Sequence, residues 1–593
     1  MSLPLVASSS IRCITSFLTR NQHLLLGSSI YRSFSRLQCR AVVKVSDQTI
    51  TRRSGNYQPA LWDYNYIQSL TSNFVVDSYT TRIDELKEDV RSMLGNKAMN
   101  RLDQLELIDT LQRLGVEYCF QDEIQRILAR IYNDKPNNNG LSNGDLYTEA
   151  LEFRLLRQNG FKVSQEIFNG FKDNQQKFKA CLCEDIEGLL SLYEASFLVE
   201  EGESILEEAR DFAAQHLKEY VNYNQGDYIS ILANHALELP LHWRMPRLEA
   251  RWYMDVYQSK RAMNPLLLEF AKMEYNNLQA VHQEDLKRAS KWWQHTGFSQ
   301  KLPFSRDRIA ECFLWSLEYA MEPQHSYFRT ECAKIIQLFT TIDDIYDVYG
   351  TLEELELFTS TLEKWDLNMM DRLPEYMKLT FLGLVNFVNE VAYITLRDHG
   401  IDILYYLKKS WIDLCKGYLV EHKWYKSGYK PALQEYLDNG WRTIGGTLIL
   451  VHAYFLTANP ITEKTMASLK EELYPDIIKW TSLGFRLADD LGTSSHEMQR
   501  GDVPKSIQCY MHETGASEEE ARAHLYYLIS DTWKKLNTAR ANDKIFCREF
   551  GRICMNVLRI AQCFYQHGDG FGIVDGETKG RFLALLAQPA PLA

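Results

Sequence analysis

The sequence predicts an all-α protein with two helical domains, and three observations lead to this prediction. The chain has only 30 glycines and 15 prolines among 593 residues. That is well below the roughly one residue in eight of an average protein, so the turns that a β-rich fold needs are scarce. Apolar residues recur at helical spacing along most of the chain. The chain is also too long for a single hydrophobic core.

The elements can be followed in order from the first clear helix. Its apolar positions are Leu105, Ile108, Leu111 and Leu114, and Gly115 is expected to end it. The next helix is predicted by Ile124, Ile127, Leu128 and Ile131. Asparagine and glycine pairs between residues 137 and 144 indicate a loop between helices.

Two domains are expected after this start. Pro240, Pro246 and Pro265 bracket shorter helices, whereas the helices after Gln300 read as longer and more apolar. We therefore expect an N-terminal helical domain over 52–275 and a C-terminal domain over 276–593. The junction between them should fall near residues 270–290.

The first 51 residues have the composition of a removable targeting segment. Residues 1–46 hold no Asp or Glu and six basic residues, and they are rich in serine. This pattern is typical of an organelle transit peptide, and the alternative is an unstructured tail. Elsewhere the longest apolar run, near 447–458, is too short to cross a membrane, so we expect no membrane partner.

The rest of the chain is acidic, which limits its partners. The net charge is −12, and removing the six basic residues of the leader leaves −18 for residues 47–593. An acidic body without a basic stripe argues against nucleic acid as a partner. An anionic substrate would then need a local positive site, made of metal ions or a few arginines.

The sharpest motif lies at the end of an apolar helix. Asp343 and Asp347 are four residues apart and share one helix face, with Asp344 next to the first. Three carboxylates there repel one another and cannot be buried unpaired. Exposure to solvent would resolve this, and so would Mg²⁺ ions, which prefer hard oxygen ligands.

A second acidic motif follows about 145 residues later. Asp489, Thr493 and Glu497 recur every four residues, so they stay within about 40° of one line along a helix. Two carboxylates and a hydroxyl on that line can form another oxygen-only metal site. Basic residues accompany the two motifs: Arg306 and Arg308 before the first, Arg486 before the second and Lys505 after it. This combination suits a magnesium–diphosphate complex, and the alternative is a set of surface ion pairs.

With these motifs identified, the chain resembles a plant class I terpene synthase of the angiosperm monoterpene synthase type, from Arg52 to the C-terminus. The resemblance rests on four ordered motifs: R-R-x8-W at Arg52, Arg53 and Trp62, R-x-R at Arg306 and Arg308, D-D-x-x-D at Asp343, Asp344 and Asp347, and D-D-x-x-T-x-x-x-E at Asp489, Asp490, Thr493 and Glu497.

The resemblance implies a C-terminal catalytic domain of the class I terpene synthase fold and an N-terminal helical barrel without chemistry of its own. It implies three Mg²⁺ or Mn²⁺ ions between the acidic motifs, with Asp343, Asp344, Asp347, Asp489, Thr493 and Glu497 as the metal-binding residues. Asp344 would support the first motif. Arg306, Arg308, Arg486 and Lys505 would hold the diphosphate of geranyl diphosphate, together with the metal-bound Asp343, Asp347 and Asp489. The expected location is the plastid (chloroplast) stroma, and we expect a monomer, with a weak homodimer as the alternative.

The resemblance also gives roles to residues around the reacting carbons. Trp315 and Tyr565 match positions that line the cavity, where aromatic faces stabilise carbocations; the alternative is that they are ordinary core residues. Arg52 and Arg53 are associated with isomerisation to linalyl diphosphate, the step before cyclisation. Phe485 is bulky for its position and would narrow the cavity, whereas Ile336 stands where isoprene-forming relatives carry a phenylalanine.

Two kinds of alternative stay open, another chain length of substrate and a protein without catalysis, and the motifs argue against two further enzyme classes. A hemiterpene or sesquiterpene synthase would use the same motifs on a different chain length. A chain-elongating prenyltransferase should carry a second D-D-x-x-D, which Thr493 and Glu497 replace here, and a protonation-initiated cyclase needs D-x-D-D, which the sequence lacks. A non-catalytic helical scaffold would be indifferent to Mg²⁺.

Overall fold

The structure is a computed structural model. It describes residues 42–45, 48–74, 76–134, 144–500, 504–572 and 576–592, without the side chains of 42–51 and 495–500. The chain divides into two compact units, Met1–Thr51 and Arg52–Ala593. In the first unit, β1 (Val42–Val45) pairs antiparallel with β2 (Gln48–Thr51), with Val42 opposite Thr51. The expected leader covers residues 1–51, and apart from these two strands its residues lie outside the described ones.

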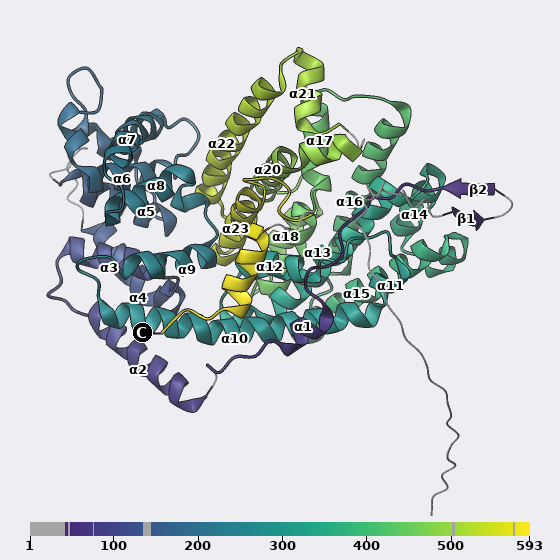
Figure 1. The fold of residues 1–593 in the computed structure, drawn as a ribbon, viewed down its shortest axis with the longest axis horizontal. Helices are drawn as coiled ribbons and strands as arrows, with labels where there is room; N and C mark the ends of the chain where they lie inside the picture. Colours follow the sequence, from purple (N-terminus) through teal and green to yellow (C-terminus); the bar gives the residue numbers. More distant parts are fainter. Residues whose placement is uncertain are drawn as a thin grey trace, which may run out of the picture. The chain divides into compact units, whose positions relative to one another are not determined.

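The second unit is built from α-helices, and the prediction of an all-α protein is confirmed (Figure 1). The first helices along the chain are α1 (Tyr64–Ser69), α2 (Asp77–Leu94), α3 (Arg101–Arg113), α4 (Gln121–Asn133), α5 (Leu146–Gln158), α6 (Ile186–Ser196), α7 (Ser204–Tyr223), α8 (Tyr228–Glu238), α9 (Pro246–Tyr257) and α10 (Pro265–Thr296). They are followed by α11 (Phe298–Lys301), α12 (Ile309–Tyr319), α13 (Ser326–Asp344), α14 (Leu352–Lys364), α15 (Glu375–His399), α16 (Leu404–Ser427), α17 (Leu433–Thr443), α18 (Gly446–Thr457), α19 (Glu463–Lys470), α20 (Asp476–Arg500), α21 (Ser506–Thr514), α22 (Glu518–Asn542), α23 (Arg548–Phe564) and α24 (Gly576–Phe582).

Short helical turns connect several of these helices. The 3₁₀ turns are η1 (Glu117–Phe120), η2 (Gln165–Phe171), η3 (Ala180–Glu184), η4 (Leu241–Trp243), η5 (Pro323–His325) and η7 (Leu367–Arg372). Two turns are π-helical, η6 (Ile345–Tyr349) and η8 (Leu583–Ala587). Turn η6 begins directly after Asp344 and contains Asp347, so it shapes the first acidic motif.

The apolar side chains predicted from helical spacing form the first hydrophobic core. In α4 the buried residues are the four expected ones, Ile124, Ile127, Leu128 and Ile131. Helix α3 ends at Arg113, and Gly115 follows with φ +70°, a left-handed conformation that glycine adopts without strain. This first core gathers side chains of α2 to α9 and of the first half of α10.

Helix α10 connects the first core to a second one. It runs unbroken over 32 residues, from Pro265 in its first turn to the left-handed Gly297 that ends it. Its side chains up to Tyr275 belong to the first core, and those from Leu286 onward belong to the second. The domain boundary that the sequence analysis expected between residues 275 and 276 therefore falls inside a continuous helix.

The second core contains a closed ring of packed helices that positions the acidic motifs. Helix α12 packs on α13, α13 on α18, α18 on α20, α20 on α23, and α23 back on α12. Helix α18, a member of this ring, is buried along nearly its whole length. Because α13 and α20 both belong to the ring, residues more than 140 positions apart in the sequence come to one end of it.

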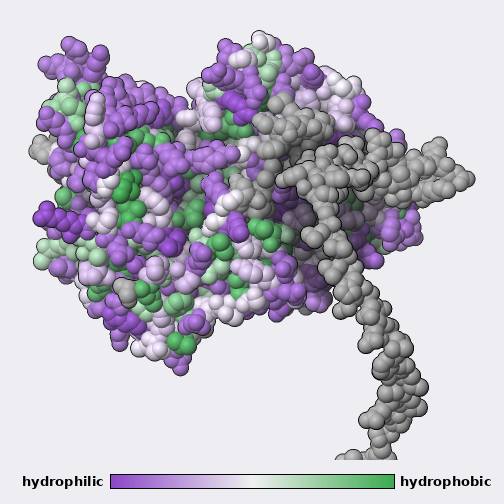
Figure 2. Space-filling view, viewed as in Figure 1, coloured by the Kyte–Doolittle hydropathy of each residue, from purple (hydrophilic) through white to green (hydrophobic). Residues whose placement is uncertain are grey.

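One helix of the described chain, α15, is long and apolar enough to cross a membrane by length and composition. Half of its most apolar window is buried inside the protein, as in a core helix of a globular fold. On the face shown in Figure 2, hydrophilic residues predominate and hydrophobic ones are scattered among them.

Candidate active site

The first acidic motif ends α13, and its two adjacent aspartates have different surroundings. Ile335, Ile336 and Leu338 bury the apolar face of the helix, which fixes the direction in which its C-terminal end points. The side chain of Asp343 is 23% exposed, whereas that of Asp344 is fully buried. Asp347 follows in η6 and is partly exposed.

Asp344 anchors the loop before α12. Its carboxylate accepts hydrogen bonds from Ser305 Oγ at 3.1 Å, from the Arg306 backbone N–H at 2.7 Å and from Arg306 Nε at 2.9 Å. Burial raises the pKa of Asp344, and Arg306 opposes that effect. A supporting role for Asp344 in the motif is compatible with these contacts and stays a prediction.

Arg306 joins both aspartates of the motif. Beyond its bonds to Asp344, its Nη2 donates to Asp343 Oδ2 at 2.5 Å, and its guanidinium lies over the ring of Tyr57 at 5.0 Å. Burial works to lower the pKa of Arg306, but Asp344, Tyr57 and Asp343 outweigh it and hold the pKa well above its usual value. The guanidinium is therefore a fixed cation beside the motif, where a phosphate oxygen can take the place of Asp343.

The second acidic motif lies on α20 and has the same division between its two aspartates. Arg486 Nη1 donates to Asp489 Oδ2 at 3.0 Å and to Asp490 Oδ1 at 3.2 Å. The side chain of Asp489 is 12% exposed, whereas that of Asp490 is fully buried. Thr493 Oγ1 donates to the Asp489 carbonyl at 3.0 Å, as expected for neighbours four apart on one helix face. The side chain of Glu497 lies outside the described residues.

Asp490 is the anchor of the second motif. Its carboxylate accepts hydrogen bonds from Tyr436 Oη at 3.1 Å, from the Ser506 backbone N–H at 3.1 Å and from Ser506 Oγ. These contacts tie α20 to α17 and to the start of α21. Tyr436 and Ser506 were not singled out from the sequence, because nothing in the local pattern indicates contacts that span 54 and 16 residues.

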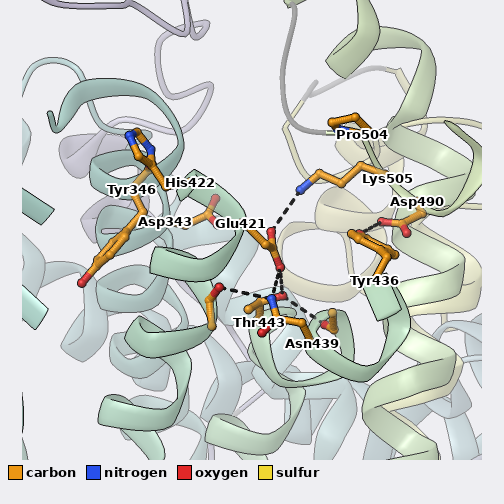
Figure 3. Close-up of polar contacts among 12 residues, drawn as sticks. Asp343, Tyr346, Glu421, His422, Tyr436, Asn439, Thr443, Asp490, Pro504 and Lys505 are labelled. Atoms are coloured by element: carbon orange, nitrogen blue, oxygen red, sulfur yellow. Dashed lines mark hydrogen bonds and ion pairs between the residues drawn. The ribbon is translucent and has the colours of Figure 1, made fainter. Parts of the chain in front are cut away.

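Lys505 is held near the second motif by a buried carboxylate that the sequence analysis also missed. Glu421 on α16 is almost completely buried, and it accepts hydrogen bonds from Thr443 Oγ1 at 2.6 Å and from Asn439 Nδ2 at 3.0 Å. Lys505 extends its Nζ toward this carboxylate, to 3.8 Å (Figure 3). Glu421 therefore orients the lysine and the end of α17 together.

Two tyrosines connect the acidic motifs electrostatically. Burial, followed by Asp343 and Asp347, raises the pKa of Tyr418 well above its usual value, while Arg486 opposes the shift. Burial, followed by Asp489, raises the pKa of Tyr565 in the same way, while Arg306 opposes it. Each tyrosine thus senses groups from both motifs, so the two sets of charges face the same region.

The structure turns Arg308 toward the backbone and not toward these carboxylates. The side chain is fully buried, and its Nη2 donates to the carbonyls of Gln58 at 2.9 Å and Gly572 at 3.3 Å. Its Nη1 donates to the carbonyl of Asp307 at 2.9 Å. These contacts join the segment before α1, which begins at Arg52 and is called the N-terminal segment below, to the loop after α23. The expected contact of Arg308 with the diphosphate stays a prediction.

The tandem arginines fasten the N-terminal segment beside the first acidic motif. Arg52 makes a bidentate pair with Glu354 on α14, at 2.8 and 2.7 Å, and donates to the Tyr349 carbonyl at 2.9 Å. Arg53 donates to the carbonyl of Asp347 at 3.1 Å and lies over the ring of Tyr425. Both arginines contact η6, which contains the third aspartate of the motif.

Aromatic rings gather around Trp315, a buried residue of α12. Its ring centroid lies 5.1 Å from Phe485, 5.1 Å from Phe564, 6.0 Å from Tyr565 and 5.8 Å from Phe571. Trp315 Nε1 has no hydrogen-bond partner among the described residues. The cluster brings together the three aromatic residues that the sequence analysis named, Trp315, Phe485 and Tyr565.

The side chains of this region fit divalent metal ions by their chemistry. Asp343, Asp347, Asp489 and Thr493 present hard oxygen donors, which Mg²⁺ prefers. Among the side chains that the structure describes, which exclude Glu497, no group of three acidic, histidine or cysteine residues is preformed as an ion site. Asp343 and Asp489 instead pair with Arg306 and Arg486.

Two family models match the chain. Residues 61–237 match the terpene synthase N-terminal domain, and residues 294–535 match the metal-binding domain of the terpene synthase family. Terpene synthase 10 of Ricinus communis is 58% identical over 92% of this chain and 99% of its own. A chloroplastic myrcene synthase of Quercus ilex is 55% identical over 94% of this chain and 93% of its own.

Solved structures agree with these sequence relatives. A limonene synthase with 2-fluorolinalyl diphosphate aligns with a TM-score of 0.88 at 44% identity, over 91% of this chain and 99% of that one. An isoprene synthase from grey poplar leaves, in complex with three Mg²⁺ ions and dimethylallyl-S-thiolodiphosphate, aligns with a TM-score of 0.82 at 44% identity, over 89% of this chain and 99% of that one. The resemblance inferred from the motifs is confirmed, and the chain belongs to the terpene synthase family.

Proposed function

We propose that this protein is a monoterpene synthase, a carbon–oxygen lyase that ionises geranyl diphosphate in a metal-dependent reaction and releases an acyclic or cyclic monoterpene. One observation carries the proposal. Each acidic motif has a buried aspartate that anchors its surroundings and an accessible aspartate paired with an arginine. The arginine of each motif also acts on the tyrosine beside the carboxylates of the other, Arg486 on Tyr418 and Arg306 on Tyr565. Such paired hard anions and fixed cations suit a metal–diphosphate complex.

The accessible oxygen donors are the proposed metal ligands: Asp343, Asp347, Asp489, Thr493 and Glu497, for Mg²⁺ or Mn²⁺ with three ions expected. Asp344 supports them by holding Arg306. The bound ions supply Lewis-acid neutralisation of the leaving diphosphate. The isoprene synthase relative, whose structure holds three Mg²⁺ ions, supports this assignment.

The basic residues have the proposed task of holding the diphosphate. Arg306 and Arg486 are buried cations whose carboxylate partners are the proposed metal ligands, so a diphosphate oxygen can replace a carboxylate on each guanidinium. Lys505 adds a point charge oriented by Glu421. A direct contact of Arg308 with the diphosphate would require its N–H groups to leave the three backbone carbonyls to which they donate.

The aromatic cluster has the proposed task of surrounding the carbocation. The faces of Trp315, Phe485 and Tyr565 stabilise positive charge without offering a nucleophile. The raised pKa of Tyr565 keeps its phenol neutral at physiological pH. Phe485 packs against both other rings, which supports its proposed effect of narrowing the space for the substrate.

The tandem arginines have a proposed role in closing the site during isomerisation. Arg52 donates hydrogen bonds to η6 and α14, and Arg53 donates one to the carbonyl of Asp347 in η6. These contacts hold the N-terminal segment next to the proposed metal ligands. From there they would exclude water while geranyl diphosphate is converted to linalyl diphosphate.

The cellular and domain assignments are also proposals. We propose import into the plastid stroma, which the chloroplastic name of the Quercus relative supports. We propose two helical domains, 52–275 and 276–593, which share α10, and a monomer as the active form.

The test is to offer the full chain geranyl, dimethylallyl and farnesyl diphosphates in separate reactions with Mg²⁺ and to identify the volatiles by chiral gas chromatography–mass spectrometry. Monoterpenes from geranyl diphosphate, at the highest kcat/KM of the three substrates, are the expected result. A higher kcat/KM with dimethylallyl diphosphate would make the protein a hemiterpene synthase. A higher kcat/KM with farnesyl diphosphate would make it a sesquiterpene synthase.

A further inference from the structure

A second positively charged region lies away from the proposed active site. Helices α3, α4, α5 and α9 of the first core, together with α22 and α23 of the second, enclose a cleft of about 520 Å³. Seven arginines line it: Arg113, Arg154, Arg244, Arg540, Arg548, Arg552 and Arg559. None of the proposed metal or diphosphate ligands is among its lining residues.

Four of these arginines have carboxylate partners. Arg113 and Arg154 share Asp109, Arg244 lies 3.7 Å from Glu249, and Arg552 pairs with Glu322. These four belong to ordinary ion pairs, one within α3 and the others between segments distant in the sequence or between a turn and a helix. They do not by themselves call for a ligand.

The other three arginines, Arg540, Arg548 and Arg559, have no carboxylate partner among the described residues. Arg559 donates to the carbonyl of His242 at 2.7 Å and to Asn556 at 2.8 Å, and Arg540 donates to the carbonyl of Gln158 at 2.9 Å. Arg548 makes no hydrogen bond to a described residue. A guanidinium has five N–H donors, so most of the donors of these side chains are left for another acceptor.

Burial and neighbouring arginines disfavour the charged forms of Arg540 and Arg559. Burial and then Arg548 and Arg552 lower the pKa of Arg540 to about 10, and burial and then Arg540 and Arg552 lower the pKa of Arg559 to about 9. An arginine stays protonated at physiological pH. The lowered pKa values therefore report an unfavourable environment for the charged form and not a loss of charge.

The carboxylates that line the cleft do not balance this charge. They are Glu117, Asp122, Glu249 and Glu549. Glu249 lies between His235 and Arg244, and Glu549 lies between His325 and Arg552, so neither is close to Arg540 or Arg559 as an ion pair. Burial raises the pKa of Glu117 to about 7, so it is only partly ionised near neutral pH, and Asp122 is exposed at the start of α4.

We propose that this cleft is a second anion site, which binds a compact phosphate-bearing ligand such as free diphosphate or the polyphosphate group of a nucleotide. Planar guanidinium groups bind phosphate oxygens in pairs. Several arginines in one cleft fit an anion with more than one charge. Among its lining residues only Ile124, Leu241, Pro246 and Met555 are apolar, and the others carry polar or charged groups, which favours a ligand whose binding rests mainly on its phosphates.

The location gives such a ligand a structural consequence. Arg540 and Arg559 reach from α22 and α23 to the carbonyls of Gln158 and His242, which flank helices of the first core. An anion between these groups would neutralise the repulsion and hold the two cores together. The inference does not depend on catalysis, so it stands or fails separately from the proposed monoterpene synthase activity.

The test is isothermal titration calorimetry of the full chain with inorganic diphosphate in EDTA, which removes metal-assisted binding at the proposed active site. Four proteins are compared: wild type, Arg540→Gln/Arg548→Gln, Arg486→Gln in the proposed active site, and Arg397→Gln. Arg397 pairs with Asp398 on the surface and serves as the matched charge control.

Loss of two guanidinium–phosphate contacts should weaken diphosphate binding by about tenfold or more. We expect this loss in Arg540→Gln/Arg548→Gln and unchanged affinity in Arg486→Gln and Arg397→Gln. The opposite pattern, with binding lost in Arg486→Gln and kept in Arg540→Gln/Arg548→Gln, would overturn the proposal. Wild-type binding of diphosphate no tighter than that of sulfate at equal ionic strength would overturn it as well.

Thermal unfolding shows whether a variant that has lost diphosphate binding is still folded. The double variant removes unpaired cations, so its Tm without ligand should equal or exceed that of wild type. Diphosphate should raise the Tm of wild type, Arg486→Gln and Arg397→Gln, but not that of the double variant. An equal rise of Tm in the double variant would contradict the proposal. A parallel titration with ATP distinguishes the sources, since tighter binding of ATP indicates a nucleotide and tighter binding of diphosphate indicates the free anion.

Discussion

Asp343 and Asp344 are adjacent in the sequence, yet they meet different surroundings. Asp344 is fully buried and accepts three hydrogen bonds from Ser305 and Arg306. Asp343 is partly exposed and accepts a hydrogen bond from Nη2 of the same arginine. The i, i+4 spacing identified the accessible pair, Asp343 and Asp347. It could not identify the anchor, because the partner of Asp344 lies 38 residues away.

The two substitutions Asp343→Asn and Asp344→Asn separate these roles. Asp344→Asn leaves the buried Arg306 without its main counter-charge, which should cost about 3 kcal/mol of unfolding free energy. Asp343→Asn also removes repulsion between neighbouring carboxylates, so it should change stability by less than about 0.5 kcal/mol. Chemical denaturation of the metal-free proteins measures both, and equal losses would contradict the division between anchor and ligand.

A second residue-scale prediction concerns Phe485, whose ring lies 5.1 Å from Trp315 and 6.5 Å from Tyr565. Phe485→Ala should enlarge the space beside these rings and shift the products from geranyl diphosphate toward cyclic skeletons, and the new cavity should cost about 3–5 kcal/mol. Leu487→Ala is the matched control, since it is buried on another face of the same helix. A product profile in Phe485→Ala equal to that of the control would refute the steric role.

The N-terminal segment, which begins at Arg52, is held in place by long-range contacts of Arg52 with Tyr349 and Glu354. Burial works to raise the pKa of Glu354, but hydrogen bonds from Arg52, Thr351 and Tyr376 outweigh it, so the pKa is lowered below 4.5. The stability that this ionised carboxylate contributes is therefore complete above pH 4.5. It is lost as the pH falls through the lowered pKa.

The variant Arg52→Lys tests the contribution of the bidentate Arg52–Glu354 pair to stability. Lysine cannot make the bidentate pair, so the loss should be about 1–3 kcal/mol at neutral pH, and the difference from wild type should shrink as Glu354 is protonated. Unfolding measured between pH 3 and 7 reports both effects. Arg82→Lys is the control, because Arg82 makes a similar bidentate pair with Glu269 on the exposed surface, where such pairs contribute little. A difference that stays constant with pH would exclude Glu354 as the partner that matters.

For the whole molecule, local patterns predicted the helices better than their assembly. The apolar spacing of α3 and α4, the glycine stop after α3 and the helical placement of the second acidic motif follow from 3.6-residue periodicity. The π-helical turn η6, which contains Asp347 of the first motif, does not. The continuity of α10 through the expected junction could not be foreseen, because no local signal there distinguishes a domain boundary from a long helix.

The parts of the site that the sequence did not reveal are those made by distant residues. The backbone contacts of Arg308 join positions 250 and 264 residues away, and Glu421 meets Lys505 across 84 residues. The arginine cleft likewise gathers residues from six helices. Burial and pairing of this kind depend on tertiary packing, which spacing within one helix does not encode.

The central claim is that the two acidic motifs bind metal ions and use them to ionise geranyl diphosphate. The most direct measurement is the rate of monoterpene formation by the full chain, first in EDTA and then during titration with Mg²⁺, for wild type, Asp343→Asn and Asp489→Asn. We predict no product in EDTA, activity restored by Mg²⁺ in wild type, and a loss of about a hundredfold or more in both variants. Product formation that is indifferent to Mg²⁺, or that survives both substitutions unchanged, would contradict it.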